Sequence, residues 1–130
     1  MIEFINASKI AAISFNLLYS ICFVETGLRN VDNFHDNKHP SRGICQVQVN
    51  TARFFAPHLD ALSLKLPVVN TLIAAKYLAY QNKRYKGNLV KVISSYNAGH
   101  FITGNKKYVA KVKKVMRELE RKQLALNDQT

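Results

Sequence analysis

A long apolar segment near the start of the chain ends on a single carboxylate. The segment covers residues 10–24, and Glu25 follows it directly. Gly27 comes two residues later, and a glycine just past the last turn commonly ends a helix in the left-handed conformation. We therefore expect Glu25 at the end of a buried helix, at the mouth of whatever cleft the following loop forms.

A carboxylic acid in this position is suited to proton transfer. Desolvation at the edge of an apolar wall disfavours the ionised form, and a general acid must hold its proton near neutral pH. Acidic residues are scarce, with eight in 130 residues. Four of them lie in the termini or in a basic C-terminal segment: Glu3, Glu118, Glu120 and Asp128. The candidates for a central site are therefore Glu25, Asp32, Asp36 and Asp60.

The first 24 residues resemble a secretion signal only superficially. Glu3 lies where a signal has a basic leader, and cleavage would remove the helix that leads to Glu25. Polar residues interrupt the segment too often for a membrane span. We expect one buried helix over residues 8–24, capped by Asn6 or Ser8.

A polar loop is predicted over residues 26–42. It contains four residues of types that bind metals: Asp32, His35, Asp36 and His39. The two histidines are four residues apart, but zinc sites use that spacing on a helix, and Pro40 with the neighbouring asparagines favours a loop. We therefore expect no metal site.

The remainder of the chain predicts short extended structure followed by helices. The extended piece covers residues 43–49. The expected helices cover residues 52–56, 60–65, 67–85, 88–97 and 107–126, with Asn50 and Thr51 capping the first and Asn88 capping the fourth. This is a mainly α chain, and at 130 residues it forms one domain.

The charge is strongly positive, with 19 Lys and Arg against 8 Asp and Glu. Such a protein is attracted to polyanions. Nucleic acid and an anionic cell wall or outer-membrane surface both fit, but no helix-turn-helix signature or aromatic–basic interleaving favours nucleic acid.

Two cysteines, Cys22 and Cys45, are too few for a disulfide framework. We interpret them as two small buried hydrophobic residues. A disulfide between them is the alternative.

Four sequence blocks in order resemble the soluble lytic transglycosylase family of the lysozyme superfamily. Residues 25–27 read Glu-Thr-Gly, residues 41–47 Ser-Arg-Gly-Ile-Cys-Gln-Val and residues 95–99 Ser-Tyr-Asn-Ala-Gly, and Tyr108 follows. The family reads Glu-Ser, Gly-Leu-Met-Gln, Ala-Tyr-Asn-Ala-Gly and a downstream Tyr. The resemblance covers about residues 8–116.

The resemblance implies a lysozyme-like, goose-type helical fold with a small β-hairpin near the substrate cleft. It implies a bacteriolytic enzyme that cleaves the N-acetylmuramic acid (MurNAc)–β-1,4–N-acetylglucosamine (GlcNAc) bond of peptidoglycan. Such an enzyme is a lyase that acts on a glycosidic bond, and it needs no cofactor. Glu25 would act as acid and then as base. The MurNAc C6 hydroxyl would attack the anomeric carbon and leave a 1,6-anhydro end.

The resemblance also implies residues that contact the substrate: Thr26, Ser41, Gln46, Tyr96, Asn97 and Tyr108. In the family the hydroxyl matched by Tyr96 approaches the catalytic acid. All of these except Thr26 have a structural alternative: Ser41 a turn residue, Gln46 a hairpin amide bonded to backbone, Asn97 a backbone cap, and the tyrosines core residues. The chain departs from the family at Thr26, usually serine, and at Cys45, usually methionine.

Two alternatives remain open. Asp32 or Asp36 could be the second carboxylate of a hydrolytic muramidase. A non-catalytic, basic module that binds peptidoglycan or nucleic acid would also explain the charge, although an intact Glu25 argues against it.

We expect a monomer without a transmembrane segment that binds glycan strands and an anionic envelope surface. Without an export signal, it would reach the wall as a bacteriophage endolysin, as a virion-borne enzyme or through a bacterial secretion system.

Overall fold

The structure is a computed structural model that describes residues 1–34 and 40–128. Its elements, in chain order, are α1 (Ile2–Ala11), α2 (Phe15–Thr26), β1 (Asp32–Asn33), β2 (Ser41–Arg42), β3 (Val47–Gln48), α3 (Val49–Phe55), the 3₁₀ helix η1 (Ala61–Lys65), α4 (Pro67–Arg84), α5 (Leu89–Ala98) and α6 (Lys106–Asp128). The mainly α fold with a small sheet is confirmed.

The N-terminal segment forms two helices, so the prediction of one helix over residues 8–24 is wrong. Ala12 adopts the left-handed conformation at φ 55° and ends α1. Ser14 then caps α2, its hydroxyl accepting the backbone N–H of Leu17 at 3.2 Å. A serine favours a cap over a helix interior because its hydroxyl satisfies an otherwise unpaired backbone N–H.

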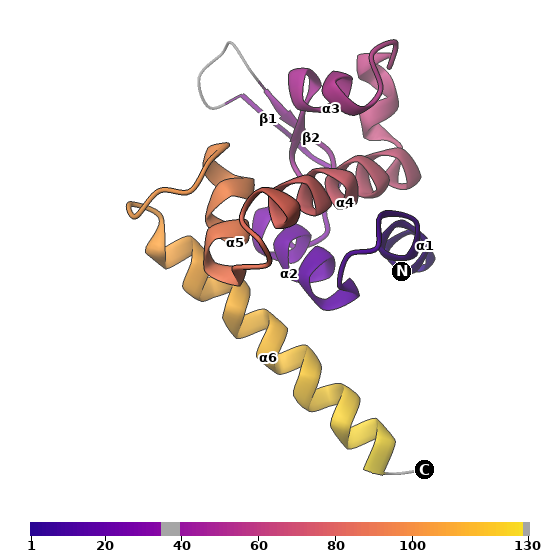
Figure 1. The fold of residues 1–130 in the computed structure, drawn as a ribbon. Helices are drawn as coiled ribbons and strands as arrows, with labels where there is room; N and C mark the ends of the chain where they lie inside the picture. Colours follow the sequence, from indigo (N-terminus) through magenta and orange to yellow (C-terminus); the bar gives the residue numbers. More distant parts are fainter. Residues whose placement is uncertain (35–39, 129–130) are drawn as a thin grey trace.

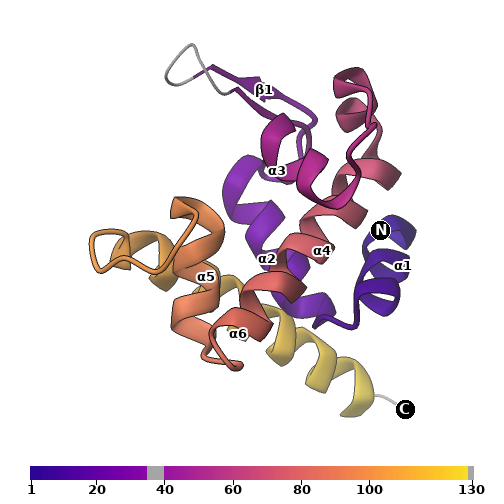
Figure 2. The same cartoon turned by 45° about the horizontal axis from the view of Figure 1, so that its top comes forward.

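Helix α2 lies at the centre of the molecule. It contacts α1, α4 and α6, and its side chains Leu18, Ile21 and Cys22 are fully buried. Figures 1 and 2 show α4 crossing beside it and the long α6 running along it before continuing past the body. Burial against several helices fixes the end of α2, and with it the position of Glu25.

The strands form a three-stranded antiparallel sheet in the order β1-β2-β3. Asp32 pairs with Arg42, and Ser41 pairs with Gln48. The expected hairpin is therefore present, with β1 as an additional edge strand. In both ribbon views the sheet and α3 lie together, on the opposite side of α2 from α5 and α6.

The later helices begin and end close to their predicted positions, with one exception. Asn88 caps α5 by accepting the N–H of Lys91 at 3.1 Å, as predicted. Helix α3 starts earlier than predicted, at Val49, and no side chain caps it. Asn50 and Thr51 therefore lie inside the helix.

A disulfide joins Cys22 of α2 to Cys45 of the turn before β3, and both residues are fully buried. The interpretation of two free cysteines is therefore wrong, and the alternative holds. The bridge fastens the central helix to the hairpin.

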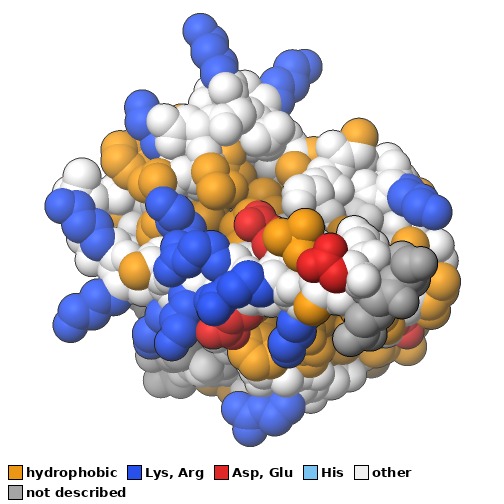
Figure 3. All heavy atoms as spheres, turned by 90° about the horizontal axis from the view of Figure 1, so that it is seen from below, with side chains coloured by type: hydrophobic (Ala, Val, Ile, Leu, Met, Phe, Trp, Pro, Cys, Tyr) orange, Lys and Arg blue, Asp and Glu red, His pale blue; other side chains and the backbone are white. Residues whose placement is uncertain are grey.

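The surface carries the excess of positive charge. Figure 3 shows Lys and Arg side chains spread over the face seen from below. Within residues 1–34 and 40–128, no helix combines the length and the apolar character that crossing a bilayer requires.

Candidate active site

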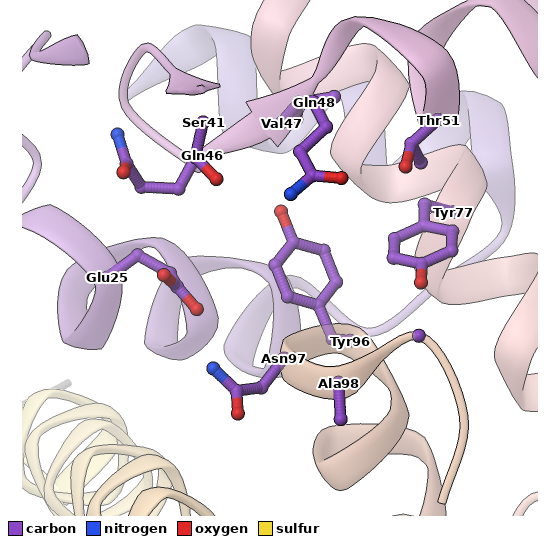
Figure 4. Close-up of a pocket in the computed structure, with 11 residues that line it drawn as sticks. Glu25, Ser41, Gln46, Val47, Gln48, Thr51, Tyr77, Tyr96, Asn97 and Ala98 are labelled. Carbon is purple, nitrogen blue, oxygen red and sulfur yellow. The ribbon is translucent and has the colours of Figure 1, made fainter. Parts of the chain in front are cut away.

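A cleft with a volume of about 340 Å³ opens beside the end of α2. The sheet, α3, α4 and α5 contribute its walls. The lining residues are Glu25, Ser41, Gln46, Val47, Gln48, Thr51, Tyr77, Tyr96, Asn97, Ala98 and Gly99. Five of the predicted site residues therefore meet there, from Glu25 to Asn97, which are 72 positions apart in the sequence (Figure 4).

Glu25 lies in the last turn of α2 and is partly buried. Gly27 ends the helix at φ 65°, and its N–H donates to the carbonyl of Phe23 at 2.7 Å, which confirms the predicted glycine cap. The carboxylate therefore projects from a rigid helix end. In Figure 4 it points into the space between the sheet and Asn97.

Tyr108 of α6 orients this carboxylate. Its hydroxyl donates to Oε2 of Glu25 at 2.7 Å. Burial raises the pKa of Tyr108 well above its ordinary value, and the nearby Glu25 raises it further. The hydroxyl thus keeps its hydrogen at neutral pH and remains a donor to Glu25.

Tyr96 does not pair with Glu25, contrary to our expectation. Its hydroxyl donates to the backbone carbonyl of Cys45 at 2.6 Å, and its ring packs beside that of Tyr77 with centroids 5.3 Å apart. Burial raises the pKa of Tyr96 well above its ordinary value, with a second contribution from Glu25. Tyr96 therefore braces the hairpin and forms part of the cleft floor, while Tyr108 orients the acid.

Gln46 lines the cleft in an uncommon backbone conformation, with φ at 55°. Its amide nitrogen donates to the carbonyls of Val31 at 2.9 Å and Gly43 at 3.0 Å. Both N–H groups are thereby used by the backbone, as the structural alternative anticipated. The amide oxygen is the part of this side chain with capacity for a ligand.

Thr26 follows the acid but lies outside the cleft lining. It is buried, and its hydroxyl donates to the carbonyl of Ile44 at 2.6 Å, with the carbonyl of Cys22 at 3.3 Å. This geometry favours a bracing role, because the side chain ties the end of α2 to the turn before β3.

Ser41 and Asn97 lie on opposite sides of the cleft. Ser41 belongs to β2, and Asn97 is near the end of α5. The carbonyl oxygen of Asn97 accepts an N–H of Asn105 at 3.1 Å. That bond fixes the amide and leaves its N–H₂ group on the cleft side as a donor.

Asn70 of α4 was not identified from the sequence. It is fully buried, its Oδ1 accepts the N–H of Cys45 at 2.9 Å, and its Nδ2 donates to the carbonyls of Arg42 at 2.8 Å and Leu64 at 2.9 Å. Gly43 packs so closely here that an added Cβ would collide with the Asn70 side chain and lie 2.6 Å from the carbonyl oxygen of Leu64. An asparagine in a predicted helix gives no signal of this role, because its partners are backbone groups distant in sequence.

Asp32 is held away from the cleft. One oxygen of its carboxylate lies 3.3 Å from Arg42 Nη1 and the other 3.1 Å from Lys65 Nζ, and Asp32 does not line the cleft. Asp36, His35 and His39 lie outside the described residues. Among the residues that the structure does describe, no three His, Cys, Asp or Glu side chains gather as a metal site would require.

Comparisons with known proteins agree with the resemblance. Residues 3–118 match the profile of the transglycosylase SLT domain. No curated protein sequence is similar enough to count as a match.

Among solved structures, the fold is similar to the lytic transglycosylase Slt of Pseudomonas aeruginosa, crystallised as an inactive mutant. The TM-score is 0.78 at 19% sequence identity, over 94% of this chain and 24% of that one. This chain therefore spans about a quarter of the length of that protein, and the similarity concerns the fold.

Proposed function

Since this chain belongs to the transglycosylase SLT family, we propose that it is a lytic transglycosylase that cleaves the MurNAc–β-1,4–GlcNAc bond of peptidoglycan. The observation that carries the proposal is the pairing of Glu25 with Tyr108 at the wall of the cleft. A carboxyl group aimed by a fixed donor is what a single acid/base catalyst requires.

The first step is general-acid catalysis. Glu25 gives its proton to the departing glycosidic oxygen while positive charge develops at the anomeric carbon of MurNAc. Tyr108 donates its hydrogen to Oε2, so we assign the transferable proton to Oε1. The hydrogen bond holds the carboxyl group in one orientation during the transfer.

The second step uses the same residue as a base. The carboxylate left by the first step removes the proton of the MurNAc C6 hydroxyl, and that oxygen bonds to the anomeric carbon. A 1,6-anhydro ring closes, the GlcNAc of the departing strand keeps the first proton, and Glu25 regains one. Neither water nor a second carboxylate takes part.

The carboxylates of the site support this mechanism over that of a two-carboxylate muramidase. Among the described residues that line the cleft, Glu25 is the single acid. Asp32 is engaged by two cations elsewhere. A hydrolytic muramidase remains the second candidate, because a water could replace the C6 hydroxyl.

Polar groups of the cleft supply the proposed contacts to the sugar. Ser41, the amide oxygen of Gln46 and the amide nitrogen of Asn97 offer donors and acceptors from two sides of the cleft. Thr26 and Tyr96 act indirectly, by holding the turn that carries Gln46. Because one chain forms the whole cleft, we propose that the protein acts as a monomer.

The disulfide and the charge support a location outside the cytoplasm. A bridge between Cys22 and Cys45 is expected to persist where conditions are oxidising, outside the cytoplasm. A net charge of +11 favours association with an anionic envelope. Both agree with action on the cell wall.

Mass spectrometry of the products tests the proposal. Purified protein is incubated with peptidoglycan, and the released muropeptides are analysed. We expect 1,6-anhydro ends, which are one water lighter than reducing ends. Reducing ends would identify a hydrolytic muramidase, whereas binding without release would identify a non-catalytic module.

A further inference from the structure

A second groove, lined by aromatic rings, adjoins the cleft. It has a volume of about 280 Å³. Helices α3 and α4 provide its lining residues, Asn50, Thr51, Phe54, Phe55, Tyr77 and Tyr80. Phe54 is 67% exposed and Tyr80 is 43% exposed. Large aromatic side chains that remain exposed together commonly mark a binding surface.

The rings form a fixed arrangement. Phe54 packs edge-on against Phe55 and Tyr80, with centroid distances of 5.0 and 5.5 Å, and Phe55 packs against Tyr77 at 6.4 Å. Edge-to-face packing of this kind holds aromatic rings in place. A ligand would therefore meet a preformed surface, at little cost in conformational entropy.

The groove is continuous with the catalytic cleft. Thr51 and Tyr77 line both hollows. Figure 4 shows these two residues at the end of the cleft away from Glu25. A polymer bound with its scissile bond at Glu25 and extending along the cleft thus continues into the groove.

The lining chemistry favours a neutral ligand with apolar faces. None of the six lining residues is charged, whereas the peptide stems of peptidoglycan carry carboxylate and ammonium groups that require charged partners when they are desolvated. A sugar ring instead offers C–H faces to the aromatic rings, and hydroxyl and acetamido groups to Asn50 and Thr51.

We propose that this groove, Asn50, Thr51, Phe54, Phe55, Tyr77 and Tyr80, is a distal subsite that binds a further N-acetylated sugar ring of the glycan strand. The proposal rests on the proposed function, since the strand must first occupy the cleft. The subsite makes the enzyme favour long strands over short fragments, because only long strands contact both the catalytic cleft and the groove.

A tryptophan introduced into the groove tests the binding directly. The protein has no tryptophan, so Phe54→Trp supplies a single fluorescent reporter, combined with Glu25→Gln to prevent cleavage. We expect its emission to change with peptide-free GlcNAc oligosaccharides and to stay constant with the free stem peptide. Leu124→Trp on the far part of α6, at a side chain 62% exposed, is the matched control and should not respond.

Two other fluorescence results would overturn the proposal. Emission that changes with the stem peptide but not with the oligosaccharide would assign the groove to the peptide. Constant emission with both ligands would show that the groove binds neither.

Activity against strand length tests the consequence. Phe54→Ala should fold normally, because the side chain is mostly exposed. We expect about five- to tenfold lower kcat/KM on long strands, mainly through KM, since part of an aromatic contact is lost. Phe54→Tyr should retain most of the activity, and fragments too short to reach the groove should be cleaved at the wild-type rate.

The two proposals fail in different ways. If wild-type protein releases no muropeptides, the proposed function is wrong. If the wild type does release muropeptides, two results would contradict the distal subsite. One is a Phe54→Ala variant with the wild-type kcat/KM on long strands. The other is a variant whose kcat/KM falls by the same factor on long strands and on short fragments.

Discussion

At the scale of single residues, the proposed mechanism depends on one carboxyl group, Glu25, and on Tyr108, which donates a hydrogen bond to it. Glu25→Gln keeps the shape of the side chain, and its amide oxygen can still accept from Tyr108, but it has no acidic proton. We expect muropeptide release to be abolished, with a thermal unfolding midpoint equal to or above that of the wild type. A variant that cleaves at near wild-type rate would remove Glu25 from the mechanism.

Two tyrosines near the acid have different partners, and their phenylalanine variants should differ accordingly. Tyr108→Phe removes the hydrogen bond to Glu25, so we expect a rate loss that is part of the roughly 10²–10⁴-fold typical of general-acid catalysis. Tyr96→Phe leaves the buried Cys45 carbonyl unpaired, so we expect mainly a stability loss of about 1–3 kcal/mol. Steady-state rates and denaturant unfolding of both variants provide the comparison, and the reverse pattern would exchange the two roles.

The same tyrosines predict a dependence of stability on alkaline pH. Burial raises the folded-state pKa of both, so above an unfolded-state pKa of about 10 the unfolded chain releases protons that the folded chain keeps. Stability is therefore unaffected below that pH and falls as pH rises beyond it. The free energy of unfolding should be measured from about pH 8 to about pH 11, a range that includes the unfolded-state pKa of tyrosine. It should fall less for the Tyr96→Phe, Tyr108→Phe double variant than for the wild type. An equal fall in both proteins would assign the alkaline sensitivity to other groups.

At the scale of secondary structure, the disulfide connects the helix of the acid to the turn of Gln46. Cys22 and Cys45 are separated by 23 positions, and closing a loop of that size stabilises a protein by about 3 kcal/mol in the chain-entropy model. We expect a Cys22→Ala, Cys45→Ala double variant to unfold at lower temperature and to lose activity through a less ordered turn. Wild-type protein that has been reduced under mild denaturant should approach the variant in unfolding temperature and activity. A variant as stable as the wild type would show that packing alone holds the turn.

The elements that could be predicted from the sequence are those governed by local interactions. Asn88, Gly27 and Gly99 specify their helix ends through bonds to neighbouring backbone groups. The predictions that failed depend on distant partners or on competing local ones. The Cys22–Cys45 bridge requires knowledge of how α2 meets the hairpin, and the break before Ser14 lies inside an apolar run that reads equally well as one helix.

The candidate site shows the same division. The order of the four sequence blocks indicated which residues gather, and five of them line one cleft. The partner of each hydroxyl could not be predicted, because it depends on side-chain reach across α2, α5 and α6. Asn70 was missed for this reason.

At the scale of the whole molecule, we expect the positive charge to hold the protein on an anionic surface. Helix α6 contributes a large share of it, through Lys106, Lys107, Lys111, Lys113, Lys114, Arg117, Arg121 and Lys122. Exposed charges are screened over about 10 Å at 0.1 M salt. We expect activity on whole cell walls to fall as salt rises, and activity on short, uncharged soluble fragments to fall much less. Equal salt dependence on both substrates would limit the charge to a role in solubility.

The contact between Glu25 and Tyr108 also sets an order of events during synthesis. The two residues are 83 positions apart, so α2 and its acid leave the ribosome long before the helix that aims that acid. A nascent chain therefore carries the acid without its donor, and so does any fragment released before α6 is translated. The Glu25–Tyr108 pair assembles only after the start of α6 has been made.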